Sequence, residues 1–252
     1  MGANIDPDSV SSGPPAYKPK HFKKVSDNIF VIQATLRKQK LWKTSRNMVI
    51  IRNQEELTLI NAVRLNRDGE EILQRLGFVG RVVRLGTSSG AEDDLHYKNY
   101  HGAQIWAPGN STSYGAPIDR IFDEDSVLPI ARSKIFVFKN SLEPEAAILI
   151  QASENQKNGL LLTSEALQNQ VHNHLLSCSS RTAMRVRGMM ESNIVISPKW
   201  LKSHQDKLPL RHDFERLLRL DFTRLISSRG AIVPLRAKEE AVLAVEMAFP
   251  VW

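Results

Sequence analysis

Runs of hydrophobic residues separated by polar turns divide the first half of the chain into short strands. Segments rich in Val, Ile and Leu predict strands because these side chains pack well on a pleated surface. The strands predicted in this half are 28–36, 47–52, 57–61, 81–85 and 103–107. The second and third are joined by a polar turn over residues 52–56, so they are expected to form a hairpin.

A change of hydrophobic period after residue 61 predicts a helix. Asp68 and Glu71 form a pair typical of a capping box, and Gly77 ends the helical pattern. A loop over residues 86–90 follows the strand 81–85. A second, short helix is predicted at 92–100.

The second half repeats the same order of elements. Its predicted strands are 134–139, 146–151, 159–163 and 231–235. The turn 153–158 joins the second and third of these strands into a hairpin. Helices are predicted after Ser164, near 180–190, at 213–226 and at 237–248.

This order predicts an α/β fold with two similar halves in one domain. No polar linker separates the halves, so residues 21–252 are expected to form a single domain. Residues 1–20 contain a cluster of turn-forming residues and few apolar ones, and they are predicted to be a flexible N-terminal arm.

The order of elements resembles that of the metallo-β-lactamase superfamily, and five stretches carry the resemblance. VSDNIFVI resembles the opening strand of that family, and MVIIRNQEELTLINAV resembles its second hairpin. RVVRLGTSSGAEDD resembles the strand and loop that bear His-x-His-x-Asp-His, and GLLLTSEALQN resembles the strand that ends in Gly-Asp. DFTRLISSRGAIV resembles the segment that ends in His-Gly. The resemblance implies a four-layer αβ/βα sandwich of two mixed sheets flanked by helices, with a site at one edge.

The same comparison implies that the standard metal centre is absent. Ser88, Ser89 and Gly90 stand where the family has imidazoles, Glu165 replaces the bridging Asp, and Arg229 replaces the last His. The region 140–145, where a third ligand histidine is usual, also has none. Arginine cannot coordinate a metal and would repel one. We therefore predict no zinc cofactor, and an ion pair between Arg229 and a carboxylate, either that of Glu165 or that of Asp93 or Asp94.

Catalysis could persist by three other routes. A divalent metal could bind the carboxylates of Asp93, Asp94 and Glu165, because oxygen ligands suit Mg, Mn or Ca. His172 and His174 would share a face on a strand and could chelate, although such a pair is more often solvated.

The third route needs no metal. Ser88 or Ser89 would be the nucleophile, with His96 or His101 as base, but no Gly-x-Ser-x-Gly elbow is present. The full set of candidate ligand-binding residues is Ser88, Ser89, Gly90, Asp93, Asp94, Glu165, His172, His174 and Arg229.

Charge is the main compositional signal for partners. The net charge is +7, concentrated in residues 1–46 and 181–238. This basic balance attracts a small anionic ligand or an acidic protein partner. No recognisable nucleic-acid-binding motif accompanies it, so nucleic acid is not the favoured partner.

The lone Cys178 excludes an intramolecular disulfide, and no apolar run is long enough for a membrane span. The first residues also lack the apolar core of a secretory signal. An intracellular, cytoplasmic location is therefore expected.

Three functions remain open at this point. The first is a pseudoenzyme that binds a ligand or serves as a scaffold. The second is a divergent metal-dependent hydrolase of an ester, thioester, lactone or phosphoester. The third is a basic structural subunit of a larger assembly.

Overall fold

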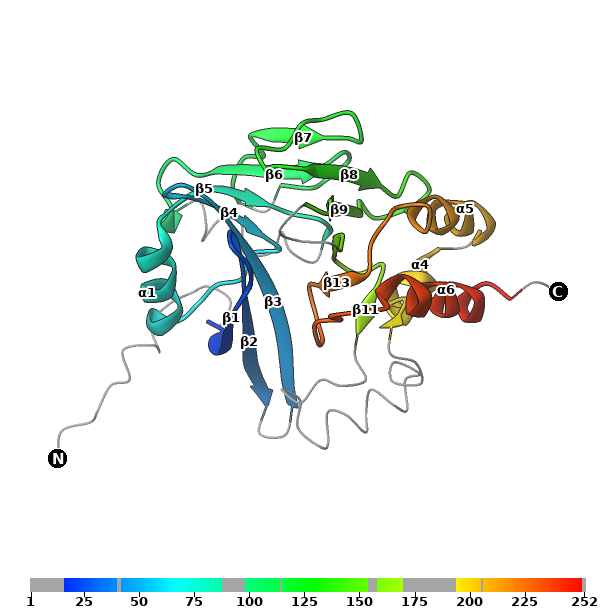
Figure 1. Cartoon of the computed structure of the whole chain (residues 1–252), viewed down its shortest axis with the longest axis horizontal. Helices are drawn as coiled ribbons and strands as arrows, with labels where there is room; N and C mark the ends of the chain where they lie inside the picture. Colours follow the sequence, from blue (N-terminus) through cyan, green and yellow to red (C-terminus); the bar gives the residue numbers. More distant parts are fainter. Residues whose placement is uncertain are drawn as a thin grey trace.

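The computed structural model describes residues 16–39, 42–87, 98–113, 115–153, 158–169, 194–204 and 206–250. Most of the secondary structure lies in two mixed sheets. Figure 1 traces the chain from the first sheet, which carries α1, to the second, which carries the C-terminal helices.

The first sheet has seven strands whose spatial order follows the sequence. They are β1 (Lys18–Ser26), β2 (Ile29–Gln39), β3 (Trp42–Asn53), β4 (Glu56–Ile60), β5 (Phe78–Val83), β6 (Gln104–Pro108) and β7 (Arg120–Phe122). The pairs from β1 to β4 are antiparallel, whereas those from β4 to β7 are parallel. The parallel connection from β4 to β5 needs a crossover, which α1 provides.

The second sheet has four strands in the order β13-β10-β9-β8. Their bounds are β8 (Ser133–Val137), β9 (Ala146–Ile150), β10 (Leu160–Thr163) and β13 (Arg224–Ser227). Only β10 and β13 run parallel. A small separate pair is formed by β11 (Gln168–Asn169) and β12 (Ile194–Val195).

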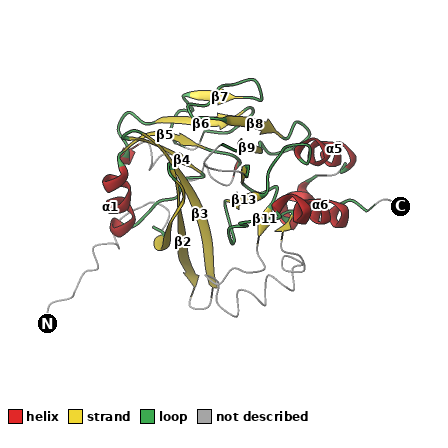
Figure 2. Ribbon diagram, viewed as in Figure 1, coloured by secondary structure: helices red, strands yellow, loops and turns green. Residues whose placement is uncertain are grey.

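Helices cover the outer faces of both sheets, which gives the predicted four-layer αβ/βα sandwich. Figure 2 shows α1 (Arg67–Leu76) beside the first sheet and the C-terminal helices beside the second. The latter are α4 (Pro198–Ser203), α5 (Leu208–Leu217) and α6 (Ala237–Ala248). None of the helices in the described ranges is long and apolar enough to cross a membrane.

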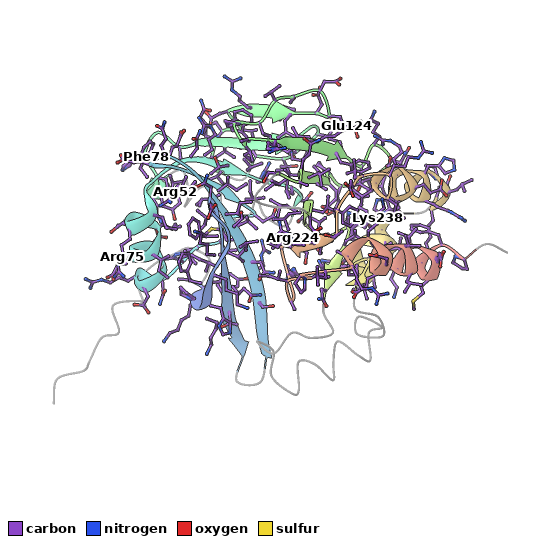
Figure 3. The ribbon with its side chains drawn as sticks, in the orientation of Figure 1. Arg52, Arg75, Phe78, Glu124, Arg224 and Lys238 are labelled. Atoms are coloured by element: carbon purple, nitrogen blue, oxygen red, sulfur yellow. The ribbon has the colours of Figure 1, made fainter. Side chains whose placement is uncertain are left out.

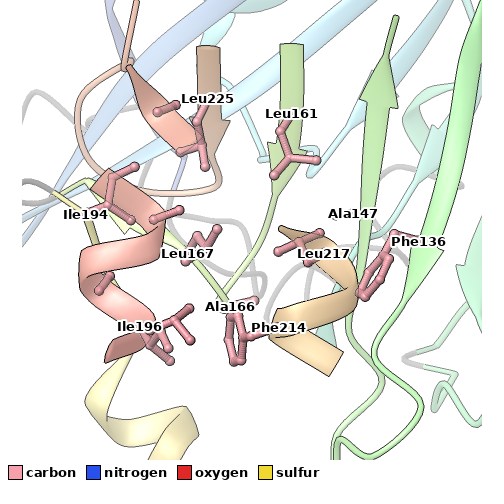
Figure 4. Packing of buried hydrophobic residues seen from close by; sticks show 14 of the residues in the cluster. Phe136, Ala147, Leu161, Ala166, Leu167, Ile194, Ile196, Phe214, Leu217 and Leu225 are labelled. Atoms are coloured by element: carbon pink, nitrogen blue, oxygen red, sulfur yellow. The ribbon is translucent and has the colours of Figure 1, made fainter. Parts of the chain in front are cut away.

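Three apolar clusters hold the layers together. One lies between the sheets and includes Val31, Ile148 and Ile226 from strands of both. A second packs α1 against the first sheet. The third packs the C-terminal helices against the second sheet, with Phe214 and Leu161 among its fully buried members (Figure 4). Burial of such side chains stabilises the fold by about 25 cal/mol per Å² of apolar surface.

Both predicted hairpins are confirmed. β3 and β4 pair antiparallel up to Asn53 and Glu56, and Gln54 adopts a positive φ of 56° in the turn. β9 and β10 also pair antiparallel. The helix predicted at 237–248 has the same bounds as α6.

The helix predicted at 213–226 is wrong in its extent. The structure has α5 from Leu208 to Leu217, followed by the strand β13. The pattern of Leu225 and Ile226 fits a helix locally, but both residues pair with β10 in parallel register. A buried strand that needs a neighbour thus overrides local helical periodicity.

Three smaller expectations also differ from the structure. Residues 164–167 form bends rather than a helix. Within the predicted strand 231–235, Val233 makes only an isolated bridge to Leu225. The cap of α1 is Asn66, whose side chain accepts a hydrogen bond from the N–H of Gly69 at 3.2 Å.

The first strand begins inside the segment predicted as an arm, because β1 starts at Lys18. Tyr17 before it is buried and bridges Leu65. The helix predicted near 180–190, and most of the one at 92–100, fall outside the described residues.

Candidate functional site

The ends of four strands meet at one edge of the sandwich. The side chain of Asn61, just after β4, donates to the carbonyl of Thr163 at the end of β10, over 2.9 Å. The segment after β5 also crosses between the sheets, because the N–H of Ala146 donates to the carbonyl of Leu85 at 2.6 Å. Segments that follow the carboxyl ends of strands are common binding positions in α/β folds.

Glu145 is the buried acid at the centre of this edge. Its side chain is 1% exposed, and its Oε1 accepts the N–H of Glu165 at 2.7 Å and of Ala166 at 2.9 Å. These two bonds fix the bend that follows β10. Glu145 therefore holds the backbone of the residue that the sequence analysis placed at the site.

The surroundings of Glu145 favour its neutral form. Burial raises the pKa of Glu145 well above its ordinary value, and the nearby Glu165 carboxylate raises it further. The backbone of Gly86 packs directly on this group. A Cβ added to Gly86 would lie 2.3 Å from Glu145 Oε2 and 2.9 Å from Ser164 Oγ.

Arg229 and Glu165 form the ion pair predicted from the sequence. Arg229 Nε lies 3.4 Å from Glu165 Oε1, and the two side chains are 32% and 17% exposed. The other oxygen of Glu165 accepts a hydrogen bond from Gln168 Nε2 at 2.8 Å. The pair joins the loop after β13 to the bend after β10, so opposite charges face each other at this edge.

Asn47 ties the end of β13 to the first sheet. Its Nδ2 donates to the carbonyls of Ser227 and Gly230, each at 2.9 Å, and its N–H donates to the carbonyl of Ser228 at 2.8 Å. Gly230 has a φ of +88°, a region that favours glycine. These contacts position Arg229 from both sides.

Only two of the nine candidate residues fall in the described part of the chain, Glu165 and Arg229, and the structure brings them together. The others lie outside it: Ser88, Ser89, Gly90, Asp93, Asp94, His172 and His174. Their place at this edge stays a prediction. Two cavities are formed by described residues, one lined by Ile150 and Arg224 and the other by Leu142 and His204. Neither of them is lined by Glu165 or Arg229.

Sequence reasoning missed Glu145. It treated the segment around this residue only as a position that lacks a histidine. A signal was present, because Glu145 immediately precedes AAILI, a strand that is buried throughout. A carboxylate at the start of such a strand must find buried donors.

Comparison with solved structures identifies the fold. The mono-zinc form of the metallo-β-lactamase FIM-1 from Pseudomonas aeruginosa is similar, with a TM-score of 0.65, 9% identity, and coverage of 92% of this chain and 97% of that one. A metallo-β-lactamase from Hirschia baltica has a TM-score of 0.60 and 11% identity, with coverage of 93% of this chain and 100% of that one. A flavo-di-iron protein variant from Thermotoga maritima has a TM-score of 0.63 and 14% identity, with coverage of 91% of this chain and 63% of that one.

The chain therefore has the metallo-β-lactamase fold. No protein-family model matches the sequence, and no curated protein is significantly similar to it. At identities of 9–14% the likeness concerns the fold alone.

The described residues at this edge do not fit the zinc that the fold implies. Arg229 is cationic and has no lone pair to donate. One oxygen of Glu145 is already held by two N–H groups. Within the described ranges, no group of three or more His, Cys, Asp and Glu side chains could hold a metal ion. We derive no chemical step through a metal here.

Proposed function

We propose that this protein is a non-catalytic binding protein built on the metallo-β-lactamase fold, and that it binds a small anion at Arg229. The observation that carries the proposal is the ion pair between Arg229 and Glu165. It puts a guanidinium and its counter-charge together at two positions where the resemblance to the family leads us to expect metal ligands.

The geometry of the pair leaves Arg229 able to bind an anion. Glu165 contacts only the Nε atom of Arg229, and the guanidinium side chain remains 32% exposed. Among the described residues, no hydrogen bond occupies the two terminal nitrogens of this arginine. A guanidinium binds carboxylate and phosphate oxygens through two parallel N–H groups, and two such groups remain here.

The chain's charge supports an anionic ligand. The segment 181–238, which includes Arg229, carries thirteen basic residues and five acidic ones. Such a field raises the local concentration of anions.

Calorimetric titration with inorganic phosphate and with acetate tests the binding. The wild type is expected to bind one of these anions at Arg229, and Arg229→Gln to lose that component of the binding. Glu165→Gln is expected to bind more tightly, because the competing carboxylate is gone. The control is Arg219→Gln, since Arg219 is an exposed arginine after α5. Equal binding by wild type and Arg229→Gln would contradict the proposal.

Metal analysis and turnover assays test the non-catalytic part. We expect less than one equivalent of zinc after purification without added metal, and no turnover of ester, thioester, lactone or phosphoester substrates. The hydrolase alternative predicts a full equivalent of metal that is lost in Glu165→Gln or Asp93→Asn/Asp94→Asn. That result, together with turnover, would replace the binding function with catalysis.

A further inference from the structure

A cavity lies at the edge of the sandwich opposite to the one that carries Arg229 and Glu165. It has a volume of about 550 Å³ and sits where β2 and β13 begin and β3 and β9 end. Strands that end at the Arg229 edge begin here, so the length of β13 separates the two places. Its size is in the range of sites that hold small organic molecules.

Three arginines from separate parts of the fold line this cavity. Arg132 precedes β8, and Arg224 is the first residue of β13. Arg52 is near the end of β3, but its guanidinium is turned away from the cavity floor, because its Cζ lies 5.6 Å from the ring centroid of Phe30 in the cluster on the α1 side of the first sheet. Figure 3 labels Arg52 and Arg224 in their strands. Within the described residues, none of the three arginines is paired with a carboxylate.

The acid that lines the cavity does not neutralise this charge. Asp27 pairs with Lys24 at 3.1 Å, and its side chain is 81% exposed. The remaining polar lining is neutral and includes Asn28, Asn53 and Asn158. The cavity is therefore strongly cationic.

Arg224 is the most constrained of the three arginines. Its Nη2 donates to the carbonyl of Asn158 at 3.3 Å, while its Nε is buried with no hydrogen-bond partner in the described structure. Burial lowers the pKa of Arg224 from its ordinary value. A cation that has lost water without gaining a counter-charge is stabilised by a bound anion.

The floor of the cavity is apolar. Four isoleucines, each at least 92% buried, come from β2, β3, β9 and the loop before β8: Ile29, Ile51, Ile150 and Ile130. An inorganic ion would leave this floor in contact with water. A ligand with an apolar body and an anionic head would cover the floor and meet the arginines at the same time.

We infer that this cavity binds a phosphate monoester with an apolar or aromatic body, held by Arg132 and Arg224. A phosphate dianion matches a two-arginine site better than a carboxylate, because it carries more charge and more acceptor oxygens. The site is independent of the anion binding proposed at Arg229.

The test uses the full chain and 1-naphthyl phosphate as probe, in wild type and in an Arg229→Gln background. One equivalent is expected to bind in that background, which separates this cavity from the Arg229 site. Each of Arg132→Gln and Arg224→Gln is expected to raise the dissociation constant about tenfold, the loss of one charged hydrogen-bonding partner. Arg52→Gln is expected to leave the dissociation constant unchanged, because this guanidinium stacks on Phe30. Arg219→Gln is the matched control.

Two further probes test the ligand class. Inorganic phosphate and 1-naphthoate are both expected to bind at least about tenfold more weakly than 1-naphthyl phosphate. Equal binding of 1-naphthoate would overturn the phosphate assignment. Unchanged binding in Arg132→Gln and Arg224→Gln, or an equal loss in Arg219→Gln, would overturn the site itself. Circular dichroism shows whether each variant folds. A variant that does not fold is replaced by the Arg→Lys change at the same position.

Discussion

The guanidinium of Arg229 contacts the carboxylate of Glu165 across the gap between the ends of β13 and β10, with 3.4 Å between Nε and Oε1. This pair is predicted from the sequence, with Arg229 at the position expected for the final His and Glu165 at that of the bridging Asp. The contact joins the loop after β13 to the bend after β10. The strength of this pair decides how much it contributes to holding the edge together.

Arg229→Ala is expected to lower the free energy of unfolding by about 1–2 kcal/mol. This lies between the values for exposed and fully buried pairs, because Arg229 is 32% exposed and makes one contact with Glu165. Chemical denaturation of Arg229→Ala, Glu165→Gln and the double variant measures the coupling.

The control for this cycle is Arg219→Ala, which should change stability by less than about 0.5 kcal/mol. Arg224 lies in the segment predicted as a helix at 213–226, where it would have been an exposed control. It is unsuitable because the structure makes it a partly buried residue of β13. Additive effects of Arg229→Ala and Glu165→Gln would show that the contact contributes nothing.

Glu145→Gln is expected to flatten the dependence of stability on pH. The folded-state pKa of Glu145 is raised above its value of 4.5, so the folded state binds the proton more tightly than the unfolded state. The stability contributed by this proton is full below pH 4.5 and is lost as the pH rises towards the folded-state pKa. Melting temperatures between pH 5 and pH 8 measure the difference.

The wild type should therefore lose more stability than Glu145→Gln over this range. The glutamine keeps an oxygen for the N–H groups of Glu165 and Ala166 but cannot ionise. Parallel profiles for the two proteins would show that Glu145 keeps the same proton occupancy in both states.

Arg216→Ala is expected to destabilise the fold by about 2–3 kcal/mol. Arg216 Nη1 donates to Asp213 at 2.8 Å, and its Nη2 pairs with Glu124. Asp213 is 1% exposed and also accepts the N–H of Asn140 at 2.7 Å, so its carboxylate would remain buried without its cation.

Urea denaturation of Arg216→Ala, compared with Arg219→Ala three residues further on and beyond the end of α5, measures this effect. Adding Asp213→Asn to Arg216→Ala should restore part of the loss, because a neutral amide needs no counter-charge. A double variant less stable than Arg216→Ala alone would contradict this account.

Gly230→Ala is expected to be much more costly than Gly102→Ala. Both glycines have a positive φ, +88° and +84°, so each alanine carries the same backbone penalty of roughly 1–2 kcal/mol. At Gly102 the new Cβ meets nothing within 4 Å, whereas at Gly230 it would lie 1.7 Å from the carbonyl oxygen of Asn169.

The extra loss at Gly230 is expected to be about 1–3 kcal/mol, the usual cost of forcing atoms into an occupied space. Thermal unfolding of the two variants gives the difference directly. Equal melting temperatures would mean that the loop after β13 moves aside without cost.

Hydrophobic patterning by itself determined most of the elements and the class of fold. Strands such as β9 and β10 are continuous apolar runs bounded by turns, and α6 carries a helical pattern over its whole length. These features depend on neighbours in sequence. The order of the elements indicated the two-sheet sandwich, and the replacement of His by Arg229 predicted its pairing with an acid.

Only the tertiary structure decided which segments became partners across long separations. Residues 224–227 have a helical pattern, yet they form β13 because β10 is buried and needs a parallel neighbour. Glu145 holds the bend after β10 because the fold places the N–H groups of Glu165 and Ala166 within hydrogen-bonding distance of its buried carboxyl group. Arg132 and Arg224, which line the same cavity, lie 92 residues apart in sequence. No local pattern can bring them together, because their proximity results from the order of the strands in the second sheet.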